Sequence, residues 1–327
     1  MKNPPSLTGL VRCGLLITGV WLLGGCVSAP LTQAPPVSDC PPIAAALTPD
    51  EVKVGVRDAR DRGFMWRIKK GDHSSYLYGT IHVARREWLF PGPALVSALR
   101  ASDTIALEID PLAPGVANSL VEGKGERQRG LTLPDSLLER LQRRIAAECL
   151  APGRMAKMGP EAQIAALNIL ASRRDGLDPT YATEIMLSGL GRNANKTVFS
   201  LEVPQTGMRA LGAPMPDQRI AWLESSLTEL ETGRVRMAAN GIAALWAASD
   251  YAELERLIES VRATPAGLQF MKRLLDDRNP ALADGIDALH TSGKNIFVAV
   301  GSAHLVGPLG LPALLAERGY EVRRVEF

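Results

Sequence analysis

The sequence predicts an α/β fold: a mixed sheet built from two β-α-β units, with a large and mainly helical insertion between them. The first observation is an apolar run at residues 76–83 (YLYGTIHV), in which a glycine is followed three residues later by His82. The second is a repeat of that pattern at residues 296–305 (IFVAVGSAHL), which carries another glycine and His304. The third is the stretch between them, about 115–290, where apolar residues recur mostly at helical spacing.

Both apolar runs predict buried strands, and each leads into the same order of elements. In the first unit a proline-initiated helix at 93–101 precedes a strand at 104–109. In the second unit a helix at 312–318 precedes a last strand at 320–327. Proline in the first helical turn and Gly319 just past the second helix are the asymmetry expected of helix ends. We therefore expect one site where the two units face each other; two unrelated β-α-β segments with the same order by coincidence are the alternative.

A hairpin is predicted at the start of the folded part. Residues 64–70 have the composition of a strand, and the sequence Gly-Asp-His-Ser-Ser at 71–75 supplies turn residues before the next strand. His73 is therefore expected in a solvated turn.

The first 25 residues have the features of an export signal. Lys2 and Arg12 precede an apolar run at 13–23 that is too short to span a bilayer, and Leu-Gly-Gly-Cys ends the segment at Cys26. That tetrapeptide resembles the lipobox of bacterial lipoproteins, which implies an acylated Cys26 and a lipid anchor. Residues 26–50 are rich in Pro and Ala and are expected to form a tether, followed by a single domain at 51–327.

Charge argues against nucleic acid as a partner. The chain has 37 Lys and Arg against 35 Asp and Glu, and removal of a signal segment with two basic residues leaves no basic excess. Proteins that neutralise nucleic-acid phosphates need such an excess. The expected contact is instead with a membrane through the lipid anchor. No Asp follows Cys26, and resemblance to Gram-negative lipoproteins then implies the outer membrane, with the protein facing the periplasm.

Two cysteines remain once Cys26 is acylated and the signal segment is removed. An exported protein is in an oxidising compartment, so Cys40 and Cys149 can pair. Such a bridge would fix the tether to a helix in the middle of the chain, whereas two separate thiols are the alternative. The sequence does not indicate the oligomeric state.

Four side chains at predicted strand ends carry the candidate chemistry. His82 and His304 follow the two glycine-containing strands, Glu108 ends the strand of the first unit, and Glu202 ends a strand at 196–203 within the helical stretch. Ligands bind at the carboxyl ends of strands in open α/β sheets. Imidazole and carboxylate together suit a Mn, Co or Zn ion, whose bound water becomes acidic enough to give its proton to a carboxylate. Taken singly, each group also fits an ordinary rim or core position.

Six short motifs stand in order along the chain. They are Tyr-Leu-Tyr-Gly-Thr-Ile-His at 76–82, Leu-Glu-Ile-Asp at 107–110, Gly-Leu-Asp at 176–178, Leu-Glu at 201–202, Arg-Asn at 278–279 and Gly-Ser-Ala-His-Leu at 301–305. In this order they resemble the TraB/GumN family (TraB/PrgY/GumN), over about residues 63–327. Its relatives include pheromone-shutdown proteins of conjugative plasmids and the animal Tiki metalloproteases. Val203 follows Glu202 where relatives more often carry Thr, which is a local departure from the pattern.

The resemblance implies metal-dependent proteolysis at the two histidines and a glutamate. It assigns His82, His304 and Glu202 as metal ligands, with Glu108 and Glu202 as candidate catalytic carboxylates. Arg278 is a candidate to stabilise an anionic intermediate or to bind a substrate carboxylate, because its planar guanidinium suits both. Two hypotheses stay open: a metal-dependent hydrolase that cleaves exported peptides or proteins, and a non-catalytic protein that binds a peptide or small ligand.

Overall fold

The computed structural model describes residues 40–116, 119, 132–151, 153–212 and 215–327. The predicted signal segment and Cys26 lie outside these residues. Within them the chain forms a six-stranded mixed sheet in the order β4-β3-β5-β2-β1-β6, which confirms the predicted fold class. The strands are β1 (Phe64–Lys70), β2 (His73–Thr80), β3 (Thr104–Leu107), β4 (Thr197–Ser200), β5 (Ile296–Gly301) and β6 (Glu321–Val325).

Four neighbouring strands of the sheet run in the same direction. β2 and β3 each pair in parallel with β5, and β3 pairs in parallel with β4, whereas β1 is antiparallel to both β2 and β6. The register places Thr80 opposite Gly301 and Leu107 opposite both Ala299 and Ser200. The carboxyl ends of all four parallel strands therefore meet at one edge of the sheet.

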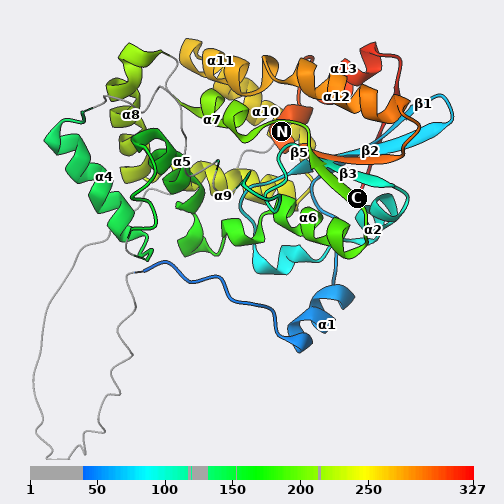
Figure 1. Cartoon of the computed structure of the whole chain (residues 1–327), viewed down its shortest axis with the longest axis horizontal. Helices are drawn as coiled ribbons and strands as arrows, with labels where there is room; N and C mark the ends of the chain where they lie inside the picture. The colour runs from blue at the N-terminus through cyan, green and yellow to red at the C-terminus, as the bar shows by residue number, and fades with distance from the viewer. Residues whose placement is uncertain (1–39, 117–118, 120–131, 152, 213–214) are drawn as a thin grey trace, which may run out of the picture. The chain divides into compact units, whose positions relative to one another are not determined.

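The two β-α-β units cross the sheet in opposite directions. The first runs from β2 through α2 (Pro93–Arg100) to β3, and the second from β5 through α13 (Leu311–Glu317) to β6. Because β5 lies between β2 and β3, the strand order reverses beside it, as at the ligand sites of open α/β sheets. Figure 1 shows α2 and α6 (Thr183–Asn193) on one face of the sheet and α12 (Asn279–Thr291) and α13 on the other.

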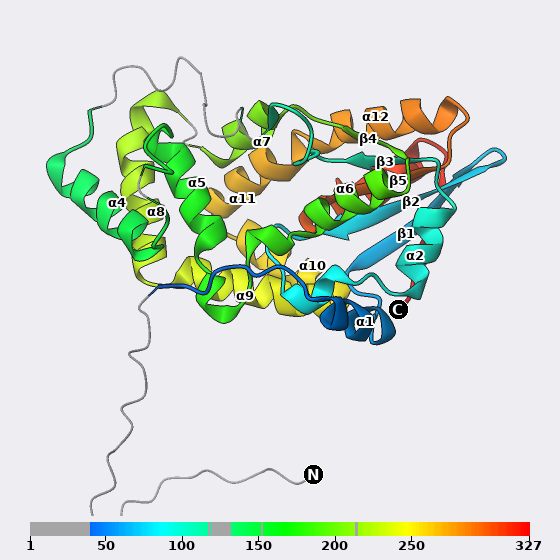
Figure 2. The same ribbon diagram turned by 60° about the horizontal axis from the view of Figure 1, so that its bottom comes forward.

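The helices of the insertion have a hydrophobic core of their own. Leu137, Ile164 and Leu227 belong to a buried cluster separate from the core that surrounds the sheet. They come from α4 (Asp135–Ala147), α5 (Pro160–Leu170) and α8 (Arg219–Glu231). Figure 2 shows these three helices beyond the end of the sheet. The insertion consists of α4 (Asp135–Ala147), α5 (Pro160–Leu170), α6, α7 (Pro204–Leu211), α8 (Arg219–Glu231), α9 (Arg234–Ala247), α10 (Tyr251–Arg262), α11 (Pro265–Met271), the π-helical turn η6 (Lys272–Asp276) and α12, with β4 among them.

Two helices and one turn differ from expectation. The helix α1 (Pro49–Arg57) begins inside the expected tether, where Thr48 and Glu51 form a reciprocal cap. The helix α7 begins at Pro204, so this proline occupies the first turn of a helix and does more than end a strand. The hairpin turn is shorter than predicted, because β2 already begins at His73; Gly71, with φ of 62°, accommodates the tight turn.

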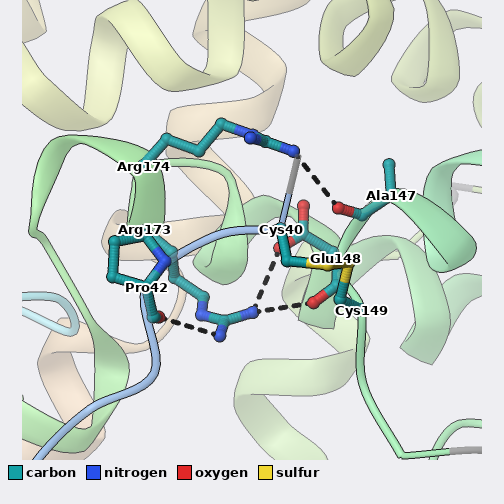
Figure 3. The surroundings of a disulfide bond; sticks show 7 residues. All are labelled: Cys40, Pro42, Ala147, Glu148, Cys149, Arg173 and Arg174. Atoms are coloured by element: carbon teal, nitrogen blue, oxygen red, sulfur yellow. Dashed lines mark hydrogen bonds and ion pairs between the residues drawn. A yellow bond between two sulfur atoms is a disulfide. The ribbon is translucent and has the colours of Figure 1, made fainter. Parts of the chain in front are cut away.

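A disulfide joins Cys40 to Cys149, just after α4, with a Cα–Cα distance of 5.6 Å (Figure 3). Beside it the Arg173 guanidinium donates to the carbonyl oxygens of Pro42 and Glu148, at 3.1 Å each. Residues 40–48 are thus bound to the domain in this structure. No helix among the described residues has the length and apolar character needed to cross a bilayer.

Candidate functional site

The structure brings the four predicted strand-end groups to one edge of the sheet. Glu108 directly follows β3, Glu202 lies two residues after β4, and His82 lies two residues after β2. His304 lies in the short turn η7 (Ser302–Leu305) that follows β5. Backbone hydrogen bonds extend past the strands, since Glu108 N–H donates to Ala299 O at 2.9 Å and Glu202 N–H to Glu108 O at 3.0 Å. The positions of both glutamates are therefore set by the sheet.

Gly301, at the end of β5, leaves a space that three of these side chains share. A Cβ atom at this position would lie 3.4 Å from Glu108 Oε2, 3.6 Å from His304 Cδ2 and 4.0 Å from His82 Nε2. The Gly301 N–H donates to Glu108 Oε2 at 3.0 Å. The missing side chain therefore leaves room between two histidines and a carboxylate that are far apart in sequence.

Arg278, at the start of α12, lies between the two glutamates. Its Nη2 donates to Glu108 Oε1 at 2.5 Å and to Glu202 Oε2 at 2.7 Å, and its Nε lies 3.2 Å from Glu202 Oε1. Its Nη1 donates to Leu274 O at 2.7 Å and contacts His304 Nε2 at 3.3 Å. The side chain is only 6% exposed, so in this structure the protein's own groups use the donors that a substrate anion would need.

The charges around Glu108 keep it ionised. Burial by itself would raise the pKa of this carboxyl group, but His304, with Nε2 3.6 Å from Oε2, and Arg278 outweigh that effect. Together they hold the pKa of Glu108 well below its usual range. The site therefore offers a carboxylate, and not a carboxylic acid, at neutral pH.

His82 pairs with Glu184, a residue in the first turn of α6. His82 Nδ1 lies 2.8 Å from Glu184 Oε1, and the Thr80 hydroxyl donates to the same oxygen at 2.7 Å. The charge of Glu184 raises the pKa of His82 to about 9 against the opposing effect of desolvation. The His82 side chain is 66% exposed while that of Glu184 is 10% exposed, so solvent screens this pair on the histidine side.

His304 is buried and bonded through its other nitrogen to Asn279. Its Nδ1 lies 2.5 Å from Asn279 Oδ1, and the Asn279 amide nitrogen donates to Leu309 O at 2.6 Å. Asn279 follows Arg278 directly, so one turn of chain at the start of α12 supplies contacts to both Glu108 and His304.

Sequence reasoning gave no role to Glu184 or Asn279. Asn279 had a signal, because it stands beside Arg278 in one of the motifs. Glu184 had none, because the first turn of a helix is an ordinary place for a glutamate. Its contact with His82 depends on how α6 packs beside the end of β2.

The donor types at this edge suit a divalent ion, but the side chains as they stand do not form a ready-made ligand cluster. Among the described residues no three His, Cys, Asp or Glu side chains are grouped closely enough to bind one. Glu202, expected as a ligand, is paired with Arg278 through both oxygens, whereas Glu108 Oε2 faces the space at Gly301 beside His82. The donors that fit a metal best are therefore the two imidazoles and Glu108, and Arg278 would have to give up its contact with His304.

These features define a class of α/β proteins with two neighbouring strands, β2 and β5, in one sheet. Each of these strands carries a glycine near its carboxyl end, and a histidine lies three residues after that glycine. The family model described as the TraB/PrgY/gumN family matches residues 64–324. The chain belongs to this family. No curated protein and no solved structure matches it.

Proposed function

We propose that the protein is an exported, membrane-anchored hydrolase, a metal-dependent peptidase whose site is the cluster around Gly301. The observation that carries the proposal is the approach of His82 Nε2, Glu108 Oε2 and the His304 ring to the one space beside Gly301. Histidine nitrogens and a carboxylate oxygen are donors that Zn, Mn and Co ions accept. Membership of the TraB/PrgY/gumN family supports a shared site but leaves the reaction open.

In this proposal His82, His304 and Glu108 hold the ion, and Glu202 keeps Arg278 in place. When bound, such an ion makes a water molecule acidic enough to act as a nucleophile near neutral pH and polarises a substrate carbonyl. His304 and Arg278 maintain Glu108 as an anion, and its Oε2 accepts from the Gly301 N–H at the edge of the space beside Gly301. The exposure of His82 gives a substrate access from solvent.

The substrate in this proposal is an exported peptide or protein. Attachment through an acylated Cys26 would hold the enzyme at the outer membrane, facing the periplasm. The sequence Leu-Gly-Gly-Cys at 23–26, directly after the apolar run, supports this attachment.

The test is a measurement of metal content together with peptide cleavage. We expect the purified protein to bind about one ion per chain and to cleave unstructured peptides, with a chelator abolishing cleavage and added metal restoring it. Glu108→Gln should abolish both metal binding and cleavage, whereas Glu202→Gln should retain the metal. His73→Ala is the matched control, because His73 starts β2 at the opposite end from the site.

The alternative is a protein that binds a peptide or small ligand without cleaving it. Its supporting observation is that contacts with the protein occupy all three nitrogens of the Arg278 guanidinium, so this side chain has no donor left for an anionic intermediate. Peptide binding that needs His82 and His304 but occurs without cleavage and without a metal would favour this alternative.

A further inference from the structure

Each histidine of the site is held by a polar side chain that does not come from the sheet. His82 contacts Glu184 of α6, and His304 contacts Asn279 of α12, both through the Nδ1 atom. Both partners are buried: counted over the whole residue, 7% of Glu184 and 1% of Asn279 is exposed. Helices on opposite faces of the sheet thus reach the same edge, each with one polar side chain (Figure 1).

Glu184 is itself fixed before it contacts His82. The Thr80 hydroxyl, from the last residue of β2, donates to Oε1 at 2.7 Å, and the neighbouring Thr183 hydroxyl accepts from Ile81 N–H at 2.9 Å. The start of α6 is therefore bonded to the two residues that precede His82. An ionised carboxylate only accepts hydrogen bonds, so the Nδ1 atom that faces it carries a proton.

Asn279 is fixed in the same way. Its amide nitrogen donates to Leu309 O at 2.6 Å, which leaves its Oδ1 atom to face His304 Nδ1 at 2.5 Å. An amide oxygen can only accept, so His304 Nδ1 also carries a proton. A second observation comes from the other side of the ring: Arg278 Nη1 lies 3.3 Å from Nε2, and a guanidinium only donates, so in the neutral ring Nε2 presents its lone pair.

We propose that Glu184 and Asn279 are positioning residues, which hold the neutral rings of His82 and His304 in the tautomer with a proton on Nδ1. His82 Nε2 then faces the space beside Gly301, and His304 Nε2 faces Arg278 and Glu108. The effect of these two residues on cleavage rests on the proposed function, whereas their contacts with the histidines do not depend on it. Histidines that bind metals usually donate their other ring N–H to a carboxylate or a carbonyl oxygen, and loss of that partner typically lowers metal affinity or activity about 10- to 100-fold.

Four variants separate positioning from structural support. Asn279→Asp keeps an oxygen for His304 Nδ1 but loses the amide donor to Leu309, whereas Asn279→Ala loses both. Glu184→Gln keeps an acceptor for His82, whereas Glu184→Ala does not. Asn240→Ala is the control, because Asn240 is a half-buried amide that donates to Asp175 at 2.6 Å.

The primary readout is the tautomer of each histidine, measured by nitrogen NMR of histidine-labelled protein at a pH where both rings are neutral. We expect Nδ1-protonated rings in the wild type, Asn279→Asp, Glu184→Gln and the control. In Asn279→Ala and Glu184→Ala the ring that lost its partner should shift to a mixture of tautomers, with cleavage about 10- to 100-fold slower. Thermal unfolding of each variant identifies any that fail to fold.

Unchanged tautomers in folded alanine variants would overturn the proposal, as would a wild-type His304 protonated on Nε2. The outcomes for the two proposals are distinct. Tautomers that depend on Glu184 and Asn279 in a protein without cleavage support positioning and refute the peptidase. Cleavage by the wild type, together with histidine tautomers that do not change in the alanine variants, refutes positioning and supports the peptidase.

Discussion

Replacement of Arg278 by Met should destabilise the protein by several kcal/mol. The side chain is buried and donates to two carboxylates that are themselves only 12% and 7% exposed, Glu108 and Glu202. Methionine fills similar volume but leaves both carboxylates without their cation. Loss of one partner from a buried ion pair typically costs about 3 to 5 kcal/mol, because the remaining charge is desolvated and unpaired. Urea denaturation, monitored by circular dichroism, measures the free energy of unfolding.

The pH dependence of this loss distinguishes charge from packing. The pKa of Glu108 is held low in the folded wild type, so its ionised form stabilises the fold above the usual carboxyl pKa, and this contribution is lost as pH falls. In Arg278→Met burial should raise that pKa, so the deficit should be largest at neutral pH and smaller in acid.

Arg318→Met is the matched control. Arg318 pairs with Asp284 at 2.6 Å, but the carboxylate is 72% exposed, and such surface pairs contribute about 0 to 1 kcal/mol. A loss below about 1 kcal/mol for Arg278→Met, or a loss that does not change with pH, would refute the view that Arg278 neutralises the site.

Three further predictions concern other parts of the domain. The pKa of His82, about 9, should fall towards 6.5 in Glu184→Gln when measured by NMR titration. The stabilisation of the fold by this pair should be present at low pH and disappear as pH rises through 9. A titration curve of His82 in the variant that matches the wild type would count against the pair. Reduction of the disulfide, which closes a loop with a sequence separation of 109, should lower the free energy of unfolding by about 2 to 5 kcal/mol. Alkylation of two thiols in the absence of reductant would contradict the bridge. Gly79→Ala should lower the free energy of unfolding by about 1 to 3 kcal/mol in urea denaturation, because its Cβ would lie 2.8 Å from Ser302 Oγ. Gly241→Ala is the control and should lower it by nothing, because there is open space around Gly241. Equal effects of the two substitutions would show that Gly79 is not in close contact with Ser302.

The strands and their order within each unit could be predicted because their signals are local. Residues 76–83 and 296–305 are apolar runs typical of buried strands, and a glycine before each histidine marks the place where the chain leaves the sheet. The repeat of this pattern also indicated that His82 and His304 would end neighbouring strands. That expectation needed only the assumption that both units belong to one sheet.

The contacts that complete the site could not be predicted, because they depend on packing between distant segments. Nothing in the sequence around Glu184 indicates that α6 would place it beside His82. Arg278 was expected to contact a substrate, but the packing of α12 against the sheet brings it into contact with Glu108 and Glu202. The helix α7 was missed because a proline after a strand reads equally as a stop and as the first residue of a helix.

Calorimetric titration of the metal-free protein with Zn, Mn or Co, compared with the same titration of three single histidine variants and one double variant, tests the single shared site most directly. We expect one ion per chain in the wild type and in His73→Ala, and no binding in either His82→Ala or His304→Ala. The double variant should lose nothing further, because the two histidines act as a unit. Full binding in His82→Ala or in His304→Ala, or two independent ions that each respond to one histidine, would contradict a site shared between the two units.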